Sequence, residues 1–539
     1  MTYEDLLQDR TLLRQRWRDA GWHIDETLDE TLLKAAEAKP DTIYHFHTVS
    51  GERHVTTSSL VEQGLHLARG LRALGLQPGD RMAVQMPTSV ETVILYIAGL
   101  AAGAVLVPVV HIYGPAELGF ILRQSGARLL GVPRRWQQID FIARVRECGE
   151  LPDLENLIVV GDEVPANAVS WAQLQDWSNR AQPISCGRSA DELCLLLYTS
   201  GTSALPKGVQ HSHNTVRAEW MIPMIDGDGP YFNPFPAGHI AGFNYSLRPI
   251  LTGTEMVFTD RWDPALAAEL VERYRVRLSG GTPFHLRGLL EAARRDGRDL
   301  RTLSGYGMGG TGVTPDHVRE AEAAGVCAYR TYGLTEHSTV SVGWSEMTST
   351  ERACSDGRVQ PGSEVRIVDE LGQELPLGTE GEILVRGPEL FMGYTDPVLD
   401  LEAFAPGGWF RTGDIGRLDA GGLLTITDRK KDIIIRGGEN ISSQEVEQVL
   451  ALHPSVAEAV AVAMPDERYG EKVCAFVVMR PGLQITLEEV RTHFRSAGMA
   501  RQKTPEALHL VDELPRTPSG KVKKAQLRAQ LRTSEMPAP

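Results

Sequence analysis

The feature that most restricts the fold of this chain is a long alternation of two kinds of segment. Between about residue 30 and residue 420, stretches with helical spacing of apolar residues alternate with short, apolar, strand-like runs. Residues 57–74 have the helical pattern, whereas residues 81–85, 156–160 and 193–198 have the strand pattern. Such alternation builds α/β layers around largely parallel sheets. The 539 residues exceed one ordinary core, so we expect about two to four folding units.

The pattern changes near residue 430, where a compact α+β unit is predicted. Strand-like residues 432–436 precede a helix, strands near 456–463 and 472–479, a second helix, a strand and a final helix. Ser442 with Glu445, and Thr486 with Glu489, have the capping-box spacing that marks helix starts. We therefore predict a large N-terminal domain (1–428) of mixed sheets layered with helices, a hinge (429–431) and a small mobile C-terminal domain (432–539).

Charge and cysteine content argue against several classes of protein. The net charge of −15 disfavours a general nucleic-acid binder, which needs a basic face. The six cysteines include no CxxC pair, which disfavours structural zinc and a disulfide framework and fits a reducing cytosol. The histidine pairs at 45/47 and 211/213 have no third ligand nearby, so we interpret these pairs as structural. The N-terminal segment mixes both charges and lacks an apolar signal core. These features predict a cytoplasmic protein.

Residues 92–110 form an uncharged stretch that is long enough to span a bilayer. Gly99 and Gly103 divide it, Pro108 lies in its β-branched part, and basic flanks are missing. A buried helix at about 91–103 followed by a buried strand at about 104–110 explains the same composition. We therefore predict no transmembrane segment.

A segment with the composition of a phosphate-binding loop follows the strand-like residues 193–198. Residues 198–208 read YTSGTSALPKG, which supplies four aliphatic hydroxyl groups, two glycines and Lys207. Glycines let backbone N–H groups turn inward, hydroxyls add donors, and lysine adds a point charge. Pro206 stands where a Walker A loop requires glycine before the lysine, so the P-loop reading fails. On composition alone, a Ser/Gly-rich surface loop remains an alternative.

The segment resembles the phosphate motif YTSGTTGxPKG of the adenylate-forming superfamily, which includes acyl-CoA synthetases, firefly luciferase and the adenylation domains of peptide synthetases. Ser203-Ala204 replaces the usual Thr-Gly, which removes one flexible glycine and keeps the hydroxyl. The resemblance covers residues about 50–530 and implies that this loop binds ATP phosphates through Thr199, Ser200, Gly201, Thr202, Ser203 and Lys207.

Further motifs of the superfamily follow in order. Gly309-Gly310-Thr311 resembles the turn beside adenine. Residues 332–336 match YGxTE, which implies that Tyr332 and Gly333 flank adenine, that Thr335 reaches the α-phosphate and that Glu336 binds Mg²⁺.

The remaining motifs lie near the predicted hinge and beyond it. The resemblance implies ribose contacts by Asp414 and Arg429, a hinge at Lys431 and a catalytic lysine at Lys521. It also implies that the turn Gly437-Gly438-Glu439 lines a channel for coenzyme A.

The acid-binding motif is represented by residues 235–243, FPAGHIAGF. The resemblance implies that His239 lies beside the substrate carboxylate and that Gly242 leaves space for the acyl group, with Phe243 and Met308 in the same pocket. Tyr245 and Thr311 complete a largely apolar wall, and we see no charge dedicated to a substrate amine. We expect an uncharged short- or medium-chain, alicyclic or aromatic acid, as in acyl-CoA ligases of the cyclohexanecarboxylate and medium-chain fatty acid type.

Taken together, the motifs predict an acid:CoA ligase that uses ATP, Mg²⁺ and CoA in two half-reactions. Acyl-adenylate forms first and pyrophosphate leaves; the C-terminal domain then swings about Lys431 and the thioester forms. Two alternatives stay open, namely an acyl-AMP ligase that loads a carrier protein and a catalytically silent adenylate-binding protein. The resemblance also allows a homodimer.

Overall fold

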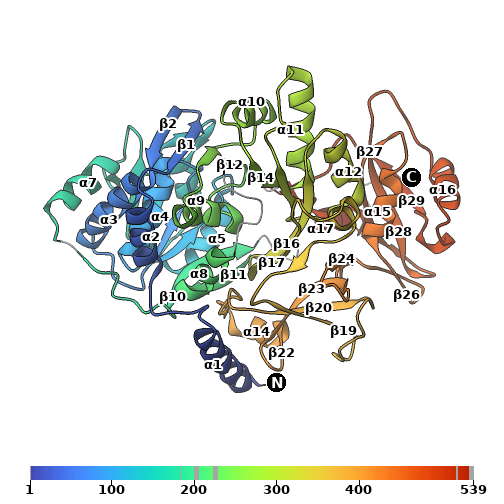
Figure 1. Cartoon of the computed structure of the whole chain (residues 1–539), viewed down its shortest axis with the longest axis horizontal. Coiled ribbons are helices and arrows are strands. Elements are labelled where there is room, and N and C mark those ends of the chain that lie inside the picture. Colours follow the sequence, from blue (N-terminus) through green and yellow to red (C-terminus); the bar gives the residue numbers. More distant parts are fainter. Residues whose placement is uncertain (1, 183, 200–205, 223–228, 518–519, 533–539) are drawn as a thin grey trace.

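Two large sheets form the scaffold of the N-terminal part in the computed structural model (Figure 1). The structure describes residues 2–182, 184–199, 206–222, 229–517 and 520–532. Both sheets are parallel in their centre and antiparallel at an edge, which confirms the α/β class.

The first sheet has the order β21-β11-β10-β4-β3-β5-β8-β9. Its strands are β3 (Arg81–Val84), β4 (Val105–Pro108), β5 (Ala127–Pro133), β8 (Asn156–Val160), β9 (Val169–Ser170), β10 (Leu193–Thr199), β11 (Lys207–Ser212) and β21 (Gly393–Tyr394). A small ribbon of β6 (Arg135–Trp136) and β7 (Ile139–Asp140) lies outside it. The helices of this part are α1 (Tyr3–Asp19), α2 (Leu28–Ala38), α3 (Thr57–Ala73), α4 (Val90–Ala101), α5 (Pro115–Ser125), α6 (Phe141–Glu147), α7 (Trp171–Arg180) and α8 (His213–Met221).

The second sheet has the order β18-β17-β16-β15-β14-β12-β13-β1-β2. Its strands are β1 (Ile43–Thr48), β2 (Gly51–Thr56), β12 (Tyr231–Asn233), β13 (Met256–Thr259), β14 (Leu278–Gly281), β15 (Gly305–Met308), β16 (Ala328–Leu334), β17 (His337–Val342) and β18 (Arg358–Val359). Its helices are α9 (Ile240–Thr252), α10 (Pro264–Arg273), α11 (Pro283–Asp296), α12 (Pro315–Ala323) and α13 (Ser349–Cys354).

The uncharged stretch folds as predicted, as a buried helix and a buried strand. It forms α4, whose residues from Thr92 onward are buried, and β4, which lies between β3 and β10. No helix in the described part of the chain is long and apolar enough to cross a membrane.

A third, antiparallel sheet connects the large body to the C-terminal unit. It contains β19 (Glu364–Val368), β20 (Gly381–Arg386), β22 (Phe404–Ala405), β23 (Trp409–Leu418) and β24 (Leu424–Arg429), with α14 (Pro397–Ala403) beside it. β23 and β24 pair so that Asp414 faces Arg429 across the ladder. Two residues predicted to contact the ribose are therefore neighbours.

The C-terminal unit has its own sheet and its own apolar cores around Ile434 and Val462. Its elements are β25 (Ile434–Arg436), β26 (Glu439–Ile441), α15 (Ser443–Ala451), β27 (Val456–Asp466), β28 (Gly470–Met479), α16 (Leu487–Ser496), a 3₁₀ turn (Arg501–Lys503), β29 (Ala507–Leu510) and α17 (Lys524–Arg532). The predicted order is confirmed, and β26 is an additional strand. The domain boundary at 429–431 stays a prediction.

The two predicted capping boxes differ. Thr486 and Glu489 bond reciprocally at the start of α16. The Ser442 hydroxyl accepts the Glu445 N–H at 3.1 Å, but the Glu445 carboxylate pairs with Lys503 at 2.6 Å. A charged partner attracts the carboxylate more strongly than a backbone N–H does, so only half of this box forms.

Candidate active site

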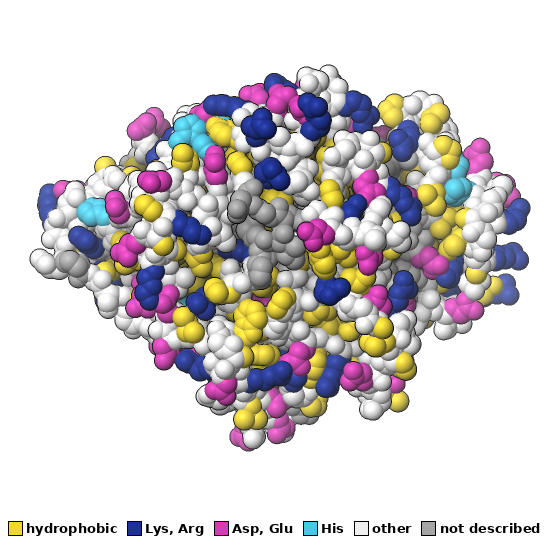
Figure 2. All heavy atoms as spheres, in the orientation of Figure 1, with side chains coloured by type: hydrophobic (Ala, Val, Ile, Leu, Met, Phe, Trp, Pro, Cys, Tyr) yellow, Lys and Arg dark blue, Asp and Glu magenta, His cyan; other side chains and the backbone are white. Residues whose placement is uncertain are grey.

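A cleft of about 1100 Å³ lies between the large body and the C-terminal unit. β10, β11, β16, β23 and β24 supply its walls, together with the segment that precedes α17. The surface around it carries interspersed charges of both signs (Figure 2). Several residues predicted to bind the nucleotide line this one cleft, namely Thr199, Lys207, Tyr332, Asp414, Arg429 and Lys521.

The phosphate segment joins two paired strands. Thr199 at the end of β10 lies opposite Lys207 at the start of β11, so the strand pairing brings these two predicted ligands together. The predicted ligands Ser200, Gly201, Thr202 and Ser203 lie outside the described residues. The Lys207 ammonium lies 5.0 Å from the centre of the Tyr394 ring, a cation–π geometry that holds it at the cleft.

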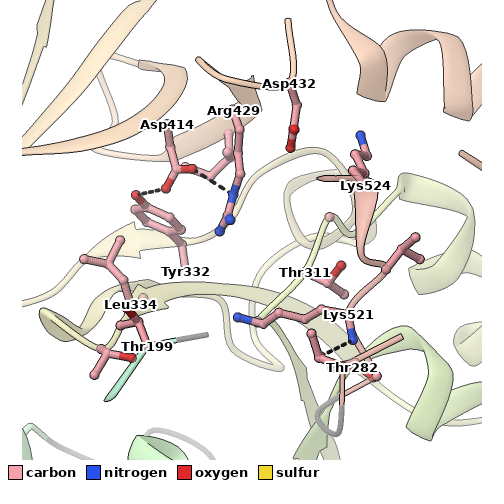
Figure 3. A pocket seen from close by; sticks show the side chains of 18 of the residues that line it. Thr199, Thr282, Thr311, Tyr332, Leu334, Asp414, Arg429, Asp432, Lys521 and Lys524 are labelled. Carbon is pink, nitrogen blue, oxygen red and sulfur yellow. Dashed lines mark hydrogen bonds and ion pairs between the residues drawn. The ribbon is translucent and has the colours of Figure 1, made fainter. Parts of the chain in front are cut away.

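Three predicted nucleotide residues are linked by direct bonds at the end of β16 (Figure 3). The Tyr332 hydroxyl donates to Asp414 at 2.6 Å, and Arg429 Nε lies 3.2 Å from the other Asp414 oxygen. Asp414 is buried, and its charge raises the pKa of Arg429. A carboxylate that is held by a cation and a hydroxyl still has lone pairs for further hydroxyl donors.

The predicted magnesium ligand Glu336 follows on the turn after β16. Its Oε1 accepts the Tyr394 hydroxyl at 2.7 Å, and burial raises its pKa. His211 Nε2 donates to the Thr335 carbonyl at 2.8 Å, which fixes the turn from the side of β11.

The donor set at this turn fits Mg²⁺. Glu336 offers a hard carboxylate, and the side chains of Thr335 and Thr199 line the same cleft with hydroxyl oxygens. Among the described residues no group of three His, Cys, Asp or Glu side chains could hold an ion alone. Magnesium in nucleotide sites usually takes one or two carboxylates and completes its shell with phosphate and water, so one carboxylate is enough.

Two predicted glycines are required by close backbone approach. A Cβ on Gly333 would lie 1.9 Å from the Ser338 carbonyl oxygen, and one on Gly309 would lie 2.4 Å from Thr331 Oγ1. Gly310 has φ +77°, which favours glycine for a different reason. Gly310, Thr311 and Gly333 line the cleft, whereas Gly309 lines the smaller cavity described below.

Lys521 brings the C-terminal unit into the site. Figure 3 shows its side chain extending past Thr311 toward Leu334 and Thr199. Burial and the positive charge of Arg429 lower the pKa of Lys521 to about 8. The predicted hinge residue Lys431 lines the same cleft, and burial lowers its pKa as well.

His239 lies where the cleft joins a second cavity. Its Nδ1 accepts the N–H of Ala241 at 3.3 Å and so caps α9. Burial, with Lys521 nearby, lowers the pKa of His239 to about 3. The ring is therefore neutral and, because Nδ1 is an acceptor, its proton sits on Nε2.

This inner cavity has a volume of about 230 Å³, and His239, Gly310, Thr335 and Lys521 line both it and the cleft. The prediction for its other walls needs correction, because Gly242, Phe243 and Met308 are not among its described lining residues. Phe243 packs on Tyr96 with ring centres 5.3 Å apart, and Met308 is buried in a separate core. Gly242 is small because a Cβ would lie 1.9 Å from the Pro236 carbonyl oxygen.

The predicted apolar wall is wrong in a second respect. Glu219 of α8 and Arg248 of α9 line the inner cavity, and both are buried. Arg248 is the only charged residue of α9, and Glu219 stands between Ala218 and Trp220 in α8. The lone charge in α9 is the signal that sequence reasoning missed, because long charged side chains are rarely buried without a reason.

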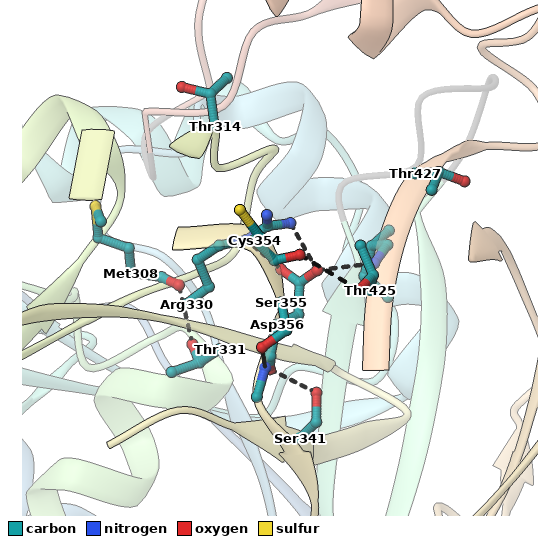
Figure 4. Close-up of polar contacts among 12 residues, drawn as sticks. Met308, Thr314, Arg330, Thr331, Ser341, Cys354, Ser355, Asp356, Thr425 and Thr427 are labelled. Atoms are coloured by element: carbon teal, nitrogen blue, oxygen red, sulfur yellow. Dashed lines mark hydrogen bonds and ion pairs between the residues drawn. The ribbon is translucent and has the colours of Figure 1, made fainter. Parts of the chain in front are cut away.

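A buried ion pair behind the nucleotide residues was also missed (Figure 4). Arg330 on β16 forms two bonds to Asp356, at 2.9 and 2.6 Å, and Asp356 also accepts the N–H of Ile426 on β24. The pair ties the strand that carries Tyr332 to the sheet that carries Asp414. Bidentate arginine–carboxylate geometry makes this connection rigid.

One predicted group lies outside both cavities. Gly437 and Gly438 form the turn between β25 and β26, with φ +59° and +89°, and Glu439 begins β26. The Gly437 N–H donates to the Tyr469 carbonyl at 2.8 Å. In this arrangement of the chain, Lys521 enters the cleft and the glycine turn does not.

The histidine pairs have protein partners. His45 bonds Glu255 at 2.7 Å and His47 bonds Tyr274 at 3.1 Å. His213 begins α8 rather than lying on the strand face with His211, and its Nδ1 accepts the N–H of Leu28.

A cleft suited to a nucleotide and a cavity suited to an acid thus meet at Lys521, the layout needed to join a carboxylate to the α-phosphate of ATP. The protein is an adenylate-forming enzyme. A family model described as AMP-binding enzyme matches residues 32–395, and one described as AMP-binding enzyme C-terminal domain matches residues 445–521. The chain belongs to this family, and within it to the AMP-forming acid–thiol ligases.

Individual relatives span almost the whole chain. The medium-chain fatty-acid–CoA ligase of Escherichia coli (strain K12) is 36% identical over 530 residues, covering 96% of this chain and 93% of that protein. The salicyl-AMP ligase / salicyl-S-ArCP synthetase of Mycobacterium tuberculosis (strain ATCC 25618 / H37Rv) is 30% identical, covering 96% of this chain and 92% of that protein. The structure of ATP-bound MatB from Rhodopseudomonas palustris has a TM-score of 0.82 at 27% identity and covers 95% of this chain and 100% of that one.

Proposed function

We propose that the protein converts a compact, uncharged carboxylic acid to its CoA thioester through an acyl-adenylate. The position of Lys521 carries this proposal, because its side chain lines both the nucleotide cleft and the inner cavity. A cation at that junction lies next to both the attacking carboxylate and the α-phosphate. It can therefore stabilise the negative charge that develops on the phosphoryl oxygens in the transition state. The cavity volume of about 230 Å³, below the roughly 300–1,000 Å³ of common ligand pockets, supports a small acid.

In the first half-reaction, a carboxylate oxygen attacks the α-phosphorus of ATP and the bond to the bridging oxygen breaks, so that pyrophosphate leaves. The protonated Lys521 amine donates to the α-phosphate or to the attacking carboxylate. Neutral His239 donates through Nε2 to the carboxylate and orients it. Asp414 accepts ribose hydroxyls while Arg429 holds its charge.

Magnesium would be held by Glu336, with the Thr335 hydroxyl close by, and would neutralise charge on the phosphates. Tyr394 positions the Glu336 carboxylate through its 2.7 Å hydrogen bond. Thr199, Lys207 and the segment between them would retain the pyrophosphate until release.

In the second half-reaction, a thiol attacks the acyl carbon and AMP leaves. The C-terminal unit turns about Lys431, withdraws Lys521 and presents Gly437-Gly438-Glu439 to the cleft. The opposite placement of these two groups supports this motion, since Lys521 lines the cleft and the turn does not.

A panel of acids assayed for AMP release with and without CoA tests the proposal. We expect CoA-dependent turnover of small alicyclic or aromatic acids and accumulation of the thioester. AMP release that yields no acyl-CoA, but labels an added carrier protein, would favour carrier loading, which is what the name of the 30%-identical mycobacterial relative describes. No ATP turnover with any acid would favour a silent adenylate-binding protein.

A further inference from the structure

The wall of the inner cavity that is not shared with the cleft carries two buried, oppositely charged side chains. Glu219 is 5% exposed and Arg248 is 8% exposed, and both line the inner cavity but not the cleft. Because Lys521 and His239 mark the end that joins the cleft, this wall faces the part of the acid remote from its carboxylate.

The hydrogen bonding of the pair is incomplete. Glu219 Oε1 accepts the Thr339 hydroxyl at 2.9 Å and lies 3.9 Å from Arg248 Nη1. Glu219 Oε2 is buried and has no hydrogen-bond partner among the described residues. Arg248 Nη2 donates to the Ile222 carbonyl, whereas its Nε is likewise buried and unpartnered within the described chain.

An open acceptor on a buried carboxylate is costly unless a ligand satisfies it. Burial raises the pKa of Glu219 to about 7, in line with this incomplete pairing. The protein could have removed the cost by replacing both side chains with apolar ones, which is often neutral or stabilising. The retained pair therefore points to a polar group of the substrate.

The charges restrict what that group can be. An ammonium would satisfy Glu219 but would meet the positive charge of Arg248, and a second carboxylate would meet the opposite problem. A hydroxyl is neutral and can both donate to Glu219 Oε2 and accept from an arginine N–H. The aromatic hydroxyls of Tyr231 and Tyr245, whose rings stack 4.5 Å apart, make the same cavity more polar.

We propose that Glu219, supported by Arg248, selects an acid that carries a neutral hydroxyl group away from its carboxylate. This inference rests on the proposed function, because it assumes that the inner cavity holds the acid. It makes Glu219 a specificity residue rather than a catalytic one.

The test uses acid-dependent ATP–pyrophosphate exchange by the full chain. Cyclohexanecarboxylic and benzoic acids are compared with their ring-hydroxylated analogues and with an aminomethyl analogue. We expect a ring-hydroxylated acid to exceed its parent in kcat/KM by roughly tenfold to a hundredfold, the effect of one hydrogen bond to a buried charged group.

Glu219→Gln then tests whether Glu219 causes the preference for the hydroxylated acid, because it keeps the size of the side chain and removes the charge and the open acceptor. We expect the ratio of hydroxylated to parent acid to fall at least about tenfold. The matched control is Asp260→Asn, which makes the same carboxylate-to-amide change at a buried residue that lines neither cavity and should keep the ratio of the unaltered protein.

The outcomes separate this inference from the proposed function. Exchange with parent acids but no preference for any hydroxylated analogue overturns the inference and leaves the proposed function standing. Preference for the aminomethyl analogue overturns the assignment of a neutral group. No exchange with any acid contradicts the proposed function and the inference together.

Discussion

The cleft and the inner cavity meet at Lys521 but differ in whether their buried polar side chains have hydrogen-bond partners. In the cleft, Asp414 is bonded to Tyr332 and Arg429, and Glu336 is bonded to Tyr394. In the inner cavity, the carboxylate of Glu219 and the guanidinium of Arg248 each keep an atom without a partner among the described residues.

This difference separates two tasks. ATP is the same in every turnover, so the residues that bind it can hold one another in place before it arrives. This preorganisation lowers the reorganisation that catalysis requires. The acid is what distinguishes one such ligase from another, and unsatisfied buried groups are what reject a substrate that lacks the matching partner. Changes in the cleft should therefore affect all acids equally, and changes in the inner cavity should affect them unequally.

The largest effect is expected from Lys521→Ala. Among the described residues of the C-terminal unit, Lys521 is the only one whose charged side chain lines both the cleft and the inner cavity. Its loss should reduce acid-dependent pyrophosphate release by roughly 10²–10³-fold, as for removal of one transition-state donor. The reduction should be the same for every acid in the panel. Pyrophosphate exchange measured acid by acid checks this.

The same variant has an internal control in the second half-reaction. Thioester formation from supplied acyl-adenylate and CoA should persist, because the proposed motion of the C-terminal unit withdraws Lys521 at that step. Normal adenylation by Lys521→Ala would falsify the assigned role, and loss of both half-reactions would indicate a damaged fold.

Tyr394→Phe should have the next largest effect. The substitution keeps the ring beneath the Lys207 ammonium and removes the hydroxyl that donates to Glu336. Residues that orient a metal ligand typically contribute about 10–100-fold in metal affinity, so the Mg²⁺ concentration for half-maximal rate should rise by about that factor. An unchanged Mg²⁺ dependence would argue against Glu336 as the ligand.

A smaller effect is expected from pH. The active form of Lys521 is the ammonium, and burial lowers its pKa to about 8, so this form is lost as pH rises through that value. The kcat/KM for adenylation, which reports the free enzyme, should fall about tenfold per pH unit above pH 8. In Lys521→Arg the fall in kcat/KM above pH 8 should disappear from this range, because a guanidinium stays charged. A fall that persists unchanged in this variant would mean that another group titrates there.

The sequence predicted the cleft better than the cavity for a physical reason. Tyr332, Asp414, Arg429 and Lys521 lie at motif positions, and each is placed by a strand or by the C-terminal unit, whose order of elements the apolar pattern predicts. Glu219 and Arg248 belong to no motif, and their meeting depends on how α8 and α9 pack, which spacing along the chain does not encode. Gly242 and Phe243 were misplaced for the same reason, since a motif position does not say which way a helical residue faces.

Thr339→Val should give the smallest effect and tests the inner cavity alone. The substitution keeps the shape of the β17 side chain and removes the hydroxyl that donates to Glu219 Oε1 at 2.9 Å. With that oxygen released, the carboxylate is held less firmly for the substrate hydroxyl, so the ratio of hydroxylated to parent acid should fall by roughly two- to tenfold, the range of one ordinary hydrogen bond. The Mg²⁺ concentration for half-maximal rate and the fall in kcat/KM above pH 8 should stay unchanged, because neither Glu336 nor Lys521 bonds to Thr339. An equal fall for all acids would instead place Thr339 among the groups that serve ATP, and the division between the cleft and the inner cavity would be wrong.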